Sequence, residues 1–254
     1  MVILKIGGNV INNAATLHEA LDYFASLIEP AILIHGGGHR ASQIITQMGH
    51  EPVMIDGRRI TDRATLEIVT MVYAGLINKE IVAQLQSRGT NAIGLSGADG
   101  NAVLADKRPV THIDYGFAGD VSAVNAPFLE ALLRLGLRPV LCPITHDRHG
   151  QLLNTNADTI ANEMAIALAR QGHEVSLQYC FELPGVLSDV HDRQSVIEKI
   201  NPTSYAEYKR QGVIAGGMLP KLDNAFRAVA AGAKEVRIGN VSGLRSGGGT
   251  SITA

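Results

Sequence analysis

The chain has 254 residues, of which 46% are hydrophobic and 18% are charged, the composition of a folded globular protein. Its 22 basic and 24 acidic residues give a net charge of −2, which argues against nucleic acid as a main partner. The first residues lack the pattern of a signal peptide, and no apolar stretch is long enough to span a membrane. We therefore expect a cytoplasmic protein with no membrane partner.

Five short apolar or β-rich runs are predicted as strands, in chain order 2–6, 31–34, 91–95, 138–141 and 175–180. Between them, apolar residues recur at three- and four-residue steps, which is typical of helices. The longest such segment opens with Asp62 or the residue before it as N-cap and stops at Gly89, and two others stop at Gly136 and Gly172. Strands alternating with helices predict a three-layer α/β/α sandwich on a mainly parallel sheet.

Two segments interrupt this alternation, PVMIDGRRIT at residues 52–61 and the stretch 102–124. We expect each to form a hairpin that projects from the sheet and serves as a lid or an interface. A change of character near residues 171–174 predicts a boundary between an N-terminal lobe, residues 1–172, and a C-terminal lobe, residues 173–254. The two cysteines, Cys142 and Cys180, stand in apolar segments and are expected to be buried and unreactive.

Lys5 stands in the first predicted strand, just before Gly7 and Gly8. Because a buried ammonium without a partner is costly, Lys5 is expected to face a pocket or an anion. Three consecutive glycines, Gly36 to Gly38, connect the second strand to a helix that begins near His39. Their backbone N–H groups and the positive end of the helix favour an anionic ligand.

The same glycines admit a second interpretation, a Rossmann-type dinucleotide-binding fold. Gly36, Gly38 and Ala41 fit G-x-G-x-x-A, and Asp56 lies 20 residues after Gly36, where a ribose-binding acid would stand. This reading gives Lys5 no role, and its strand is not the first in the chain. The segments GGMLPK and GLSGA miss the phosphate-loop and nucleophile-elbow spacings, and the nine histidines lack metal-ligand spacing, so no metal-binding side chains are expected.

Polar residues beside glycines or helix starts remain: Lys5, Arg59, Asn154, Asp158 and Lys221. Asp158 follows Asn154 by one helical turn, so both are expected to point the same way from the start of a helix over 155–171. Two lysines, a carboxylate that orients them and glycine N–H donors suit phosphoryl transfer, which needs positive charge where negative charge accumulates. The arginine before Arg59 is expected to face solvent.

Seven motifs follow one another along nearly the whole chain: KIGGN, HGGG, GRRIT, GLSGADG, GDVSAVN, GQLLNTNAD and GVIAGGMLPK. In this order they resemble the amino acid kinase family, and within it the members that act on an N-acyl-L-glutamate. The resemblance implies an open, mainly parallel eight-stranded sheet between helical layers. It also implies transfer of the γ-phosphoryl group of ATP to the side-chain carboxylate of N-acetyl-L-glutamate, a step of arginine biosynthesis, with Mg²⁺ held mainly by the phosphates.

The resemblance further implies roles for individual residues. Lys5 and Lys221 would stabilise the transition state from the two lobes, and Asp158 would hold both ammonium groups. Gly8 would donate its N–H to the phosphoryl group. The remaining nucleotide contacts would come from Phe181, Glu182, Gly185, Val213, Ile214 and Ala215.

The acyl amino acid would be bound in the N-terminal lobe. Gly36 and Gly37 would donate N–H groups, Arg59 would pair with a substrate carboxylate, and Asn154 would bind the α-carboxylate or amide region. N-succinyl-L-glutamate stays open as an alternative substrate, as do carbamate, aspartate, free glutamate and nucleotides. A binding protein without catalysis on the same scaffold also stays open.

The sequence departs from the family pattern in three places. FELPGV carries Glu182 where many relatives have Asp in T-D-V-x-G-V, and Ala98 replaces a lysine common in relatives. The arginine-inhibited relatives carry an extra N-terminal helix, whereas four residues precede Lys5. We therefore expect an arginine-insensitive homodimer.

Overall fold

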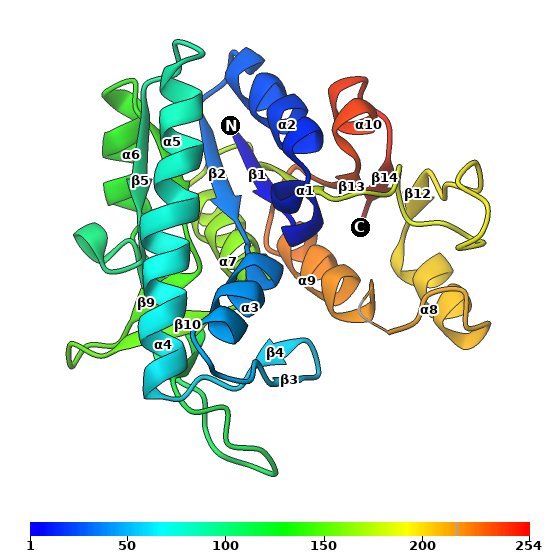
Figure 1. Cartoon of the computed structure of the whole chain (residues 1–254). Helices are drawn as coiled ribbons and strands as arrows, with labels where there is room; N and C mark the ends of the chain where they lie inside the picture. Colours follow the sequence, from blue (N-terminus) through cyan, green and yellow to red (C-terminus); the bar gives the residue numbers. More distant parts are fainter. Residues whose placement is uncertain (217) are drawn as a thin grey trace.

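The computed structural model describes residues 1–216 and 218–254, and Gly217 of the GVIAGGMLPK motif lies outside the described residues. An eight-stranded sheet crosses the molecule in the order β12-β14-β13-β11-β1-β2-β8-β5 (Figure 1). Neighbouring strands are parallel except β13 and β14. The strands are β1 (Val2–Ile6), β2 (Ala31–His35), β5 (Ala92–Leu95), β8 (Arg138–Leu141), β11 (Ser176–Cys180), β12 (Lys199–Ile200), β13 (Glu235–Gly239) and β14 (Thr250–Ile252). The predicted mainly parallel sheet is confirmed.

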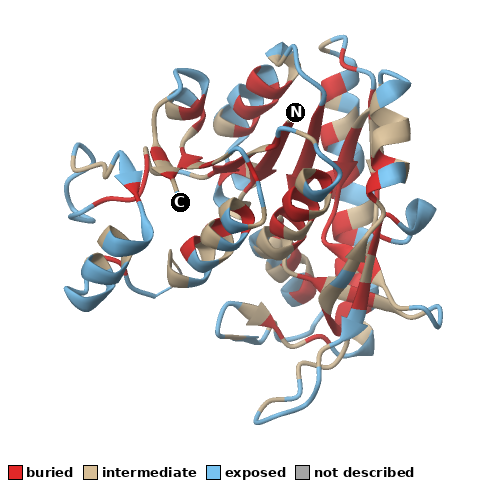
Figure 2. Cartoon of the chain, turned by 180° about the vertical axis from the view of Figure 1, so that it is seen from behind, coloured by how far each residue is buried: buried red, intermediate tan, exposed pale blue. Residues whose placement is uncertain are grey.

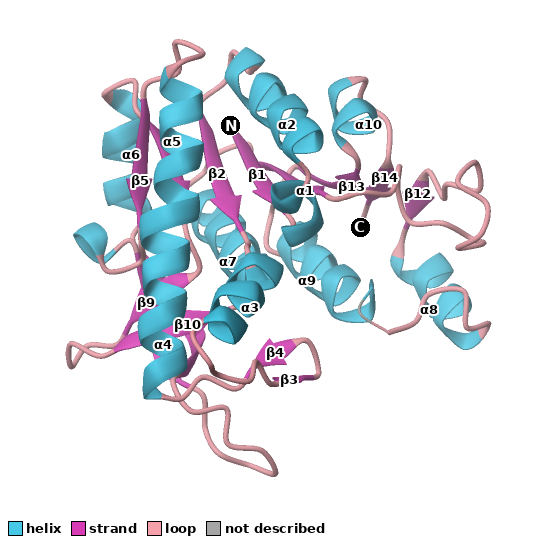
Figure 3. Ribbon diagram, in the orientation of Figure 1, coloured by secondary structure: helices cyan, strands magenta, loops and turns pink. Residues whose placement is uncertain are grey.

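Helices cover both faces of this sheet, as expected for a three-layer sandwich (Figure 3). One face carries α2 (Ala14–Ser26), α5 (Asn78–Gln86) and α10 (Val241–Arg245), and the other carries α6 (Ala126–Arg134), α7 (Ala157–Arg170) and α9 (Met218–Ala230). Three more helices, α1 (Gly8–Asn12), α3 (Gly38–Gln47) and α8 (Pro202–Arg210), complete the layers. Figure 2 shows the strands buried between the helices and exposed residues at the loops and outer helix faces.

Strand β1 explains where Lys5 points. Val2, Leu4 and Ile6 pack in the core beneath α2, whereas Ile3 packs in the second core, beneath α7. Side chains alternate along a strand, so Lys5 faces the same side as Ile3 and is directed toward α7. The sequence therefore delivers an ammonium group to the start of that helix.

One long helical segment runs from residue 63 to residue 86, as α4 (Arg63–Thr70), the π-helical stretch η1 (Met71–Ile77) and α5. Asp62 is its N-cap, accepting a hydrogen bond from Thr65 N at 2.7 Å, and Gly89 follows its end with φ of +73°, so the expected boundaries are confirmed. The π-helical stretch was not predicted, since its apolar spacing does not differ from that of an α-helix. It turns Tyr73 and Ile77 inward.

Both predicted hairpins exist, but only one stands by itself. β3 (Met54–Ile55) and β4 (Arg58–Arg59) form a separate antiparallel pair. β6 (Val103–Lys107) and β7 (Ala118–Val124) are also antiparallel, and the loop that joins them extends away from the body of the molecule (Figure 1). They close a small barrel with β9 (Ile144–His146) and β10 (Leu152–Thr155), two strands that the sequence reading missed.

The structure also describes the two cysteines and the length and character of the helices. Cys142 and Cys180 are buried free thiols, and burial raises the pKa of each to about 12, so they are unreactive as predicted. Across residues 1–216 and 218–254, no helix combines the length and the apolar character that crossing a bilayer requires.

Candidate active site

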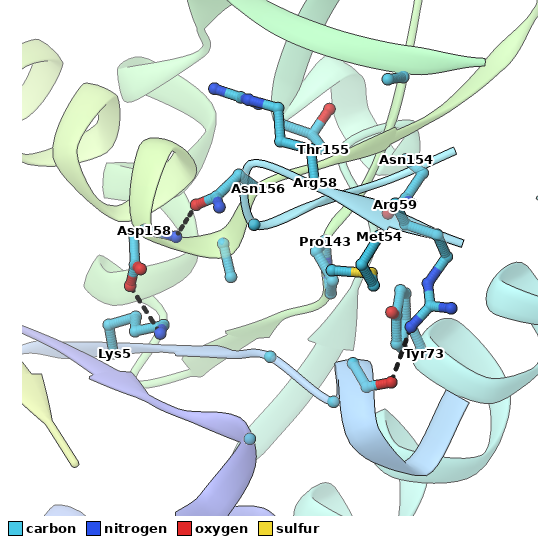
Figure 4. A pocket seen from close by; sticks show the side chains of 17 residues that line it. Lys5, Met54, Arg58, Arg59, Tyr73, Pro143, Asn154, Thr155, Asn156 and Asp158 are labelled. Carbon is cyan, nitrogen blue, oxygen red and sulfur yellow. Dashed lines mark hydrogen bonds and ion pairs between the residues drawn. The ribbon is translucent and has the colours of Figure 1, made fainter. Parts of the chain in front are cut away.

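A single carboxylate, that of Asp158, joins the two lysines singled out by the sequence. Lys5 Nζ lies 2.6 Å from Asp158 Oδ1 and Lys221 Nζ lies 3.0 Å from Oδ2. The Lys221 contact is a hydrogen bond, whereas the Lys5 contact is an ion pair without hydrogen-bond geometry. Two positive charges against one negative charge leave the cluster with one net positive charge. Figure 4 shows Lys5 and Asp158 facing each other beside the loop before α7.

The local sequence holds Asp158 in place. Asn156 is the N-cap of α7, and its side-chain oxygen accepts hydrogen bonds from Asp158 N at 2.8 Å and Thr159 N at 3.1 Å. Asp158 therefore lies in the first turn, where the helix dipole favours a negative charge. Burial alone would raise the pKa of the Asp158 carboxyl, but Lys5 and Lys221 outweigh it and lower the pKa to about 2. The carboxylate is thus ionised at any physiological pH.

Two of the cavities that border this cluster are lined by Lys5. One, the N-terminal pocket, has a volume of about 190 Å³, and its lining includes Lys5, Gly8, Gly36, Gly37, Gly38, Arg58, Arg59, Tyr73, Asn154, Asn156 and Asp158. The other, the C-terminal cleft, has a volume of about 370 Å³, and its lining includes Lys5, Gly8, Asn9, Asp158, Phe181, Glu182, Met218 and Lys221. Because Lys5 and Asp158 border both, a group could pass from one cavity to the other beside the two ammonium groups.

The glycine loop after β2 forms the floor of the N-terminal pocket. Gly37 has φ of +141°, and a Cβ there would lie 2.5 Å from Ile77 Cδ1 of the π-helical stretch, so only glycine fits. Gly36 N donates to Ile6 O at 3.1 Å, which contradicts the expectation that its N–H is available to a ligand. Among the described residues, Gly37 N and Gly8 N have no backbone acceptor, and both residues line the pocket.

Arg59 enters the pocket from strand β4 with its guanidinium almost fully buried. Its NH2 donates to Gly38 O and to Ser42 Oγ, both at 2.8 Å, and Figure 4 shows Arg59 pointing toward the glycine-loop helix. Its NH1 is buried and has no partner among the described residues. A buried guanidinium with an unused donor is unfavourable unless an anion occupies the neighbouring space. Tyr73, whose pKa burial raises, also lines the pocket near Arg59.

Two expectations about neighbouring residues are wrong. Asn154 lies on strand β10, not on the first turn of α7, because Asn156 is the cap and the helix begins two residues later than expected. Asn154 nevertheless lines the pocket, and its Nδ2 donates to Thr61 Oγ1 at 3.0 Å. Arg58 is not a solvated residue: it is half-buried, lines the same pocket and lies 3.9 Å from Asp120.

The predicted nucleotide contacts divide into two groups. Phe181 and Glu182 line the C-terminal cleft, and Glu182 Oε1 accepts a hydrogen bond at 2.9 Å from Nδ2 of Asn9 in α1. The others are not part of its lining. Gly185 packs too closely on Thr250 for a side chain, with a Cβ position 2.8 Å from Thr250 Oγ1, and the segment 213–215 is tied by Val213 N and Ile214 N to Tyr208 O.

This fold and site define a protein that brings two ligands together around a pair of cations, the arrangement that transfer of a phosphoryl group needs. The model of the amino acid kinase family matches residues 1–240. The chain belongs to the amino acid kinase family. The Rossmann interpretation is not supported: Asp56, its supposed ribose-binding acid, lies in the turn between β3 and β4 with φ of +50°.

Curated relatives cover nearly the whole chain. A protein of Cytophaga hutchinsonii named acetylglutamate kinase is 56% identical over 94% of this chain and 90% of its own length. One of Phocaeicola vulgatus with the same name is 51% identical over 99% of this chain and 98% of its own. Among solved structures, N-acetylglutamate synthase from Neisseria gonorrhoeae, complexed with coenzyme A and N-acetyl-glutamate, has the same fold with a TM-score of 0.85. It is 21% identical and matches 100% of this chain and 59% of its own.

Proposed function

We propose that this protein transfers the γ-phosphoryl group of ATP to the side-chain carboxylate of N-acetyl-L-glutamate, a step of arginine biosynthesis. The observation that carries the proposal is the Asp158 carboxylate shared by Lys5 and Lys221 where the two cavities meet. The relatives named acetylglutamate kinase supply the choice of acceptor. In the reaction a carboxylate oxygen forms a bond to the γ-phosphorus as the bond to the ADP oxygen breaks, giving an acyl phosphate and ADP.

In this mechanism the two lysines reach the moving group from different elements. Lys5 comes from β1 and borders both cavities, whereas Lys221 comes from α9 and borders the C-terminal cleft. Asp158 keeps them near each other in the resting enzyme. When phosphate oxygens enter, each ammonium can share its charge with them, because Asp158 neutralises only one of the two. Gly8 N–H and Gly37 N–H add donors that need no rearrangement.

The acceptor is held by the N-terminal pocket. The unpaired NH1 of Arg59 binds a substrate carboxylate, and Asn154, oriented by Thr61, binds the α-carboxylate or amide region. Gly36 contributes by its backbone position, since its N–H is already bonded to Ile6 O. The N-terminal lobe, residues 1–172, thus binds the acylated amino acid, and residues 173–254 bind ATP.

ATP carries Mg²⁺ in this reaction, and the metal screens the charge of the phosphates. The described residues contain no group of three or more His, Cys, Asp or Glu side chains suited to a metal ion. Asp158 is already engaged by two lysines.

A hydroxamate assay tests the proposed acceptor, because hydroxylamine traps an acyl phosphate. N-acetyl-L-glutamate, N-succinyl-L-glutamate, free glutamate, aspartate and carbamate are each supplied with magnesium ATP, and release of ADP is followed in parallel. We expect the highest kcat/KM with N-acetyl-L-glutamate. A higher value with the succinyl compound would correct the acyl group, and activity only on the unacylated substrates would refute the proposal.

Hydrogen exchange tests the division of labour between the lobes. N-acetyl-L-glutamate is expected to protect the amides of residues 36–38 and 154–158. The nucleotide analogue AMP-PNP with Mg²⁺ is expected to protect residues 181–185 and 213–215. Protection of 36–38 by the nucleotide alone would reverse the assignment of the two cavities.

We also propose that the enzyme is a cytoplasmic homodimer that arginine does not inhibit. One chain has a mass of 27.0 kDa, and light scattering should give twice this mass. Activity at saturating substrates should be unchanged by millimolar arginine. A hexamer, or inhibition by arginine, would contradict this part of the proposal.

A further inference from the structure

A buried histidine stands directly before the glycine loop, and the mechanism above does not use it. His35 is the last residue of β2 and is inaccessible to solvent. Its Nδ1 lies 2.8 Å from Gly36 O, and its Nε2 lies 3.2 Å from Asn78 Nδ2. Both ring nitrogens therefore have partners, although the ring lies between the sheet and the long helix.

The partners determine which ring nitrogen carries the proton. A carbonyl oxygen can only accept, so Nδ1 must carry a hydrogen and donate it to Gly36 O. Nε2 then has a lone pair and accepts from the Asn78 amide. Burial lowers the pKa of His35 to about 4, against the hydrogen bond to Gly36 O, and the nearby Lys79 lowers it further. The imidazole is neutral at pH 7 and is a fixed donor toward the glycine loop.

Asn78 fixes the ring from the other side. Its Nδ2 also donates to Val140 O at 2.9 Å, and its Oδ1 accepts from Lys79 Nζ at 3.2 Å. Since Oδ1 faces the lysine and Nδ2 faces both acceptors, the orientation of the amide is determined by its surroundings. Each polar group in this series of hydrogen bonds, from Lys79 to Gly36, has a partner. A buried polar network rigidifies its neighbours under this condition.

The last link is the peptide between Gly36 and Gly37. In a trans peptide the C=O and the following N–H point in opposite directions, so holding Gly36 O toward His35 turns Gly37 N–H the other way. Gly36 N is bonded to Ile6 O, so Gly36 is fixed at both of its polar atoms. Gly37 lines the N-terminal pocket, and its own N–H has no backbone acceptor among the described residues.

We propose that His35 is a positioning residue, which through Nδ1–H locks the Gly36–Gly37 peptide so that Gly37 N–H donates to the anion in the N-terminal pocket. Without that lock, two glycines in sequence would let the peptide flip and direct Gly36 O, a partial negative charge, at the anion. The effect on rate rests on the proposed phosphoryl transfer. The protonation of the ring and the direction of the peptide do not.

Three substitutions separate the donor from the rest of the ring. In His35→Asn the side-chain amide can occupy the place of Nδ1 and donate to Gly36 O, whereas in His35→Gln it reaches the place of Nε2. His35→Leu removes both. We expect His35→Asn to keep kcat within about fivefold of the wild type, and the Gln and Leu variants to lose about 10- to 100-fold in kcat with less change in KM, toward the scale of one lost donor.

Thermal unfolding of the same variants distinguishes positioning from general stability. Support requires that the Asn and Gln variants have similar Tm values but different kcat values. Equal kcat values in all three folded variants would overturn the proposal. It would also be overturned if the Asn variant lost as much kcat as the Gln variant.

Imidazole ¹⁵N spectra of the unmodified protein provide a measurement that needs neither catalysis nor a variant. We expect His35 to be neutral, with its proton on Nδ1, between pH 8 and pH 5. A proton on Nε2, or a cationic ring at pH 7, would overturn the proposal even if the variants fail to fold. A wild type that forms no acyl phosphate but shows this tautomer would refute the proposed function and leave the peptide lock standing.

Discussion

The N-terminal pocket and the C-terminal cleft both lie at the carboxyl ends of strands of the large sheet, but their linings differ. The pocket is lined by the buried Lys5 and Arg59, and its glycine loop is preceded by the buried His35, which is bonded to the buried Asn78. The cleft has the larger volume and is bordered by the partly exposed Phe181 and the exposed Glu182. Burying polar groups is costly, so it is concentrated where a small acceptor must be recognised.

The difference suggests where discrimination takes place. A site whose buried donors need a partner rejects a ligand that leaves them unpaired, and this discrimination is stronger than an apolar surface can provide. The unpaired NH1 of Arg59 is such a donor. Away from the lysine cluster, the polar side chain that borders the cleft at Glu182 is exposed, and an exposed contact tolerates more variation. Substitutions in the two regions should therefore have effects of different kinds.

The largest effect is expected where the two regions meet. Lys221→Ala should lower kcat by about 10²-fold or more with a smaller change in KM, because a charge-stabilising donor is lost from the transition state. Steady-state kinetics with both substrates varied measures this. The matched control is Lys234→Ala, which removes an exposed lysine paired with Glu174. A change confined to KM in the Lys221 variant would mean that its role has been misassigned.

Low pH should destabilise the folded protein through His35, which stands beside the N-terminal pocket. The pKa of the folded protein, about 4, lies below the 6.5 of the unfolded chain, so only the unfolded chain takes up a proton as pH falls between them. The free energy of unfolding should therefore fall by roughly 3 kcal/mol from pH 6.5 to pH 4. Denaturant unfolding at both pH values measures this change in the wild type and in His35→Asn. The contribution of His35 is the difference between the two proteins. Identical pH dependence would show that His35 is not buried in its neutral form.

A moderate effect is expected from the buried arginine. Arg59→Lys should raise KM for N-acetyl-L-glutamate about tenfold or more and leave KM for ATP unchanged, because lysine cannot bind Gly38 O, Ser42 and a carboxylate together. The control is Arg58→Lys at the adjacent position, which should change KM about threefold at most. Equal effects of the two substitutions would contradict the view that Arg59, and not Arg58, binds the acceptor carboxylate.

The smallest effect is expected on the nucleotide side. Asn9→Ala removes the hydrogen bond to Glu182 that joins α1 to the cleft, and an exposed bond of this kind contributes little. KM for ATP should rise about threefold, with no change in KM for N-acetyl-L-glutamate. A larger change in the acceptor KM would mean that the two cavities are coupled more closely than their construction indicates.

Sequence reasoning succeeded where a side chain's position follows from a regular repeat. The first apolar run gave the strand that carries Lys5, and the spacing of apolar residues gave the long helix and its Asp62 cap. It failed where short-range signals compete. Asn154 and Asn156 both suit a helix cap, and the sequence reading placed the start of α7 too early. Strands β9 and β10 are short and partly polar, so no run of apolar residues marked them.

Other features depend on contacts between distant segments. Nothing near His35 in the sequence indicates that Asn78, 43 residues later, completes its hydrogen bonds. The exclusion of a side chain at Gly37 depends on Ile77 of the π-helical stretch, and that stretch resembles an ordinary helix in its spacing. Residue types and approximate placement could be predicted, but which N–H groups remain available could not, because that is decided by tertiary packing.

The position of β1 in the middle of the large sheet has a consequence while the protein is being synthesised on the ribosome. Val2 pairs on one side with Ala31 and on the other with Ser176, so one edge of this apolar strand finds its partner early and the other must wait for most of the polypeptide to leave the ribosome. An unpaired edge of this kind invites association with other chains. The strand that bears Lys5 is therefore a segment whose free edge benefits from chaperone protection on nascent chains.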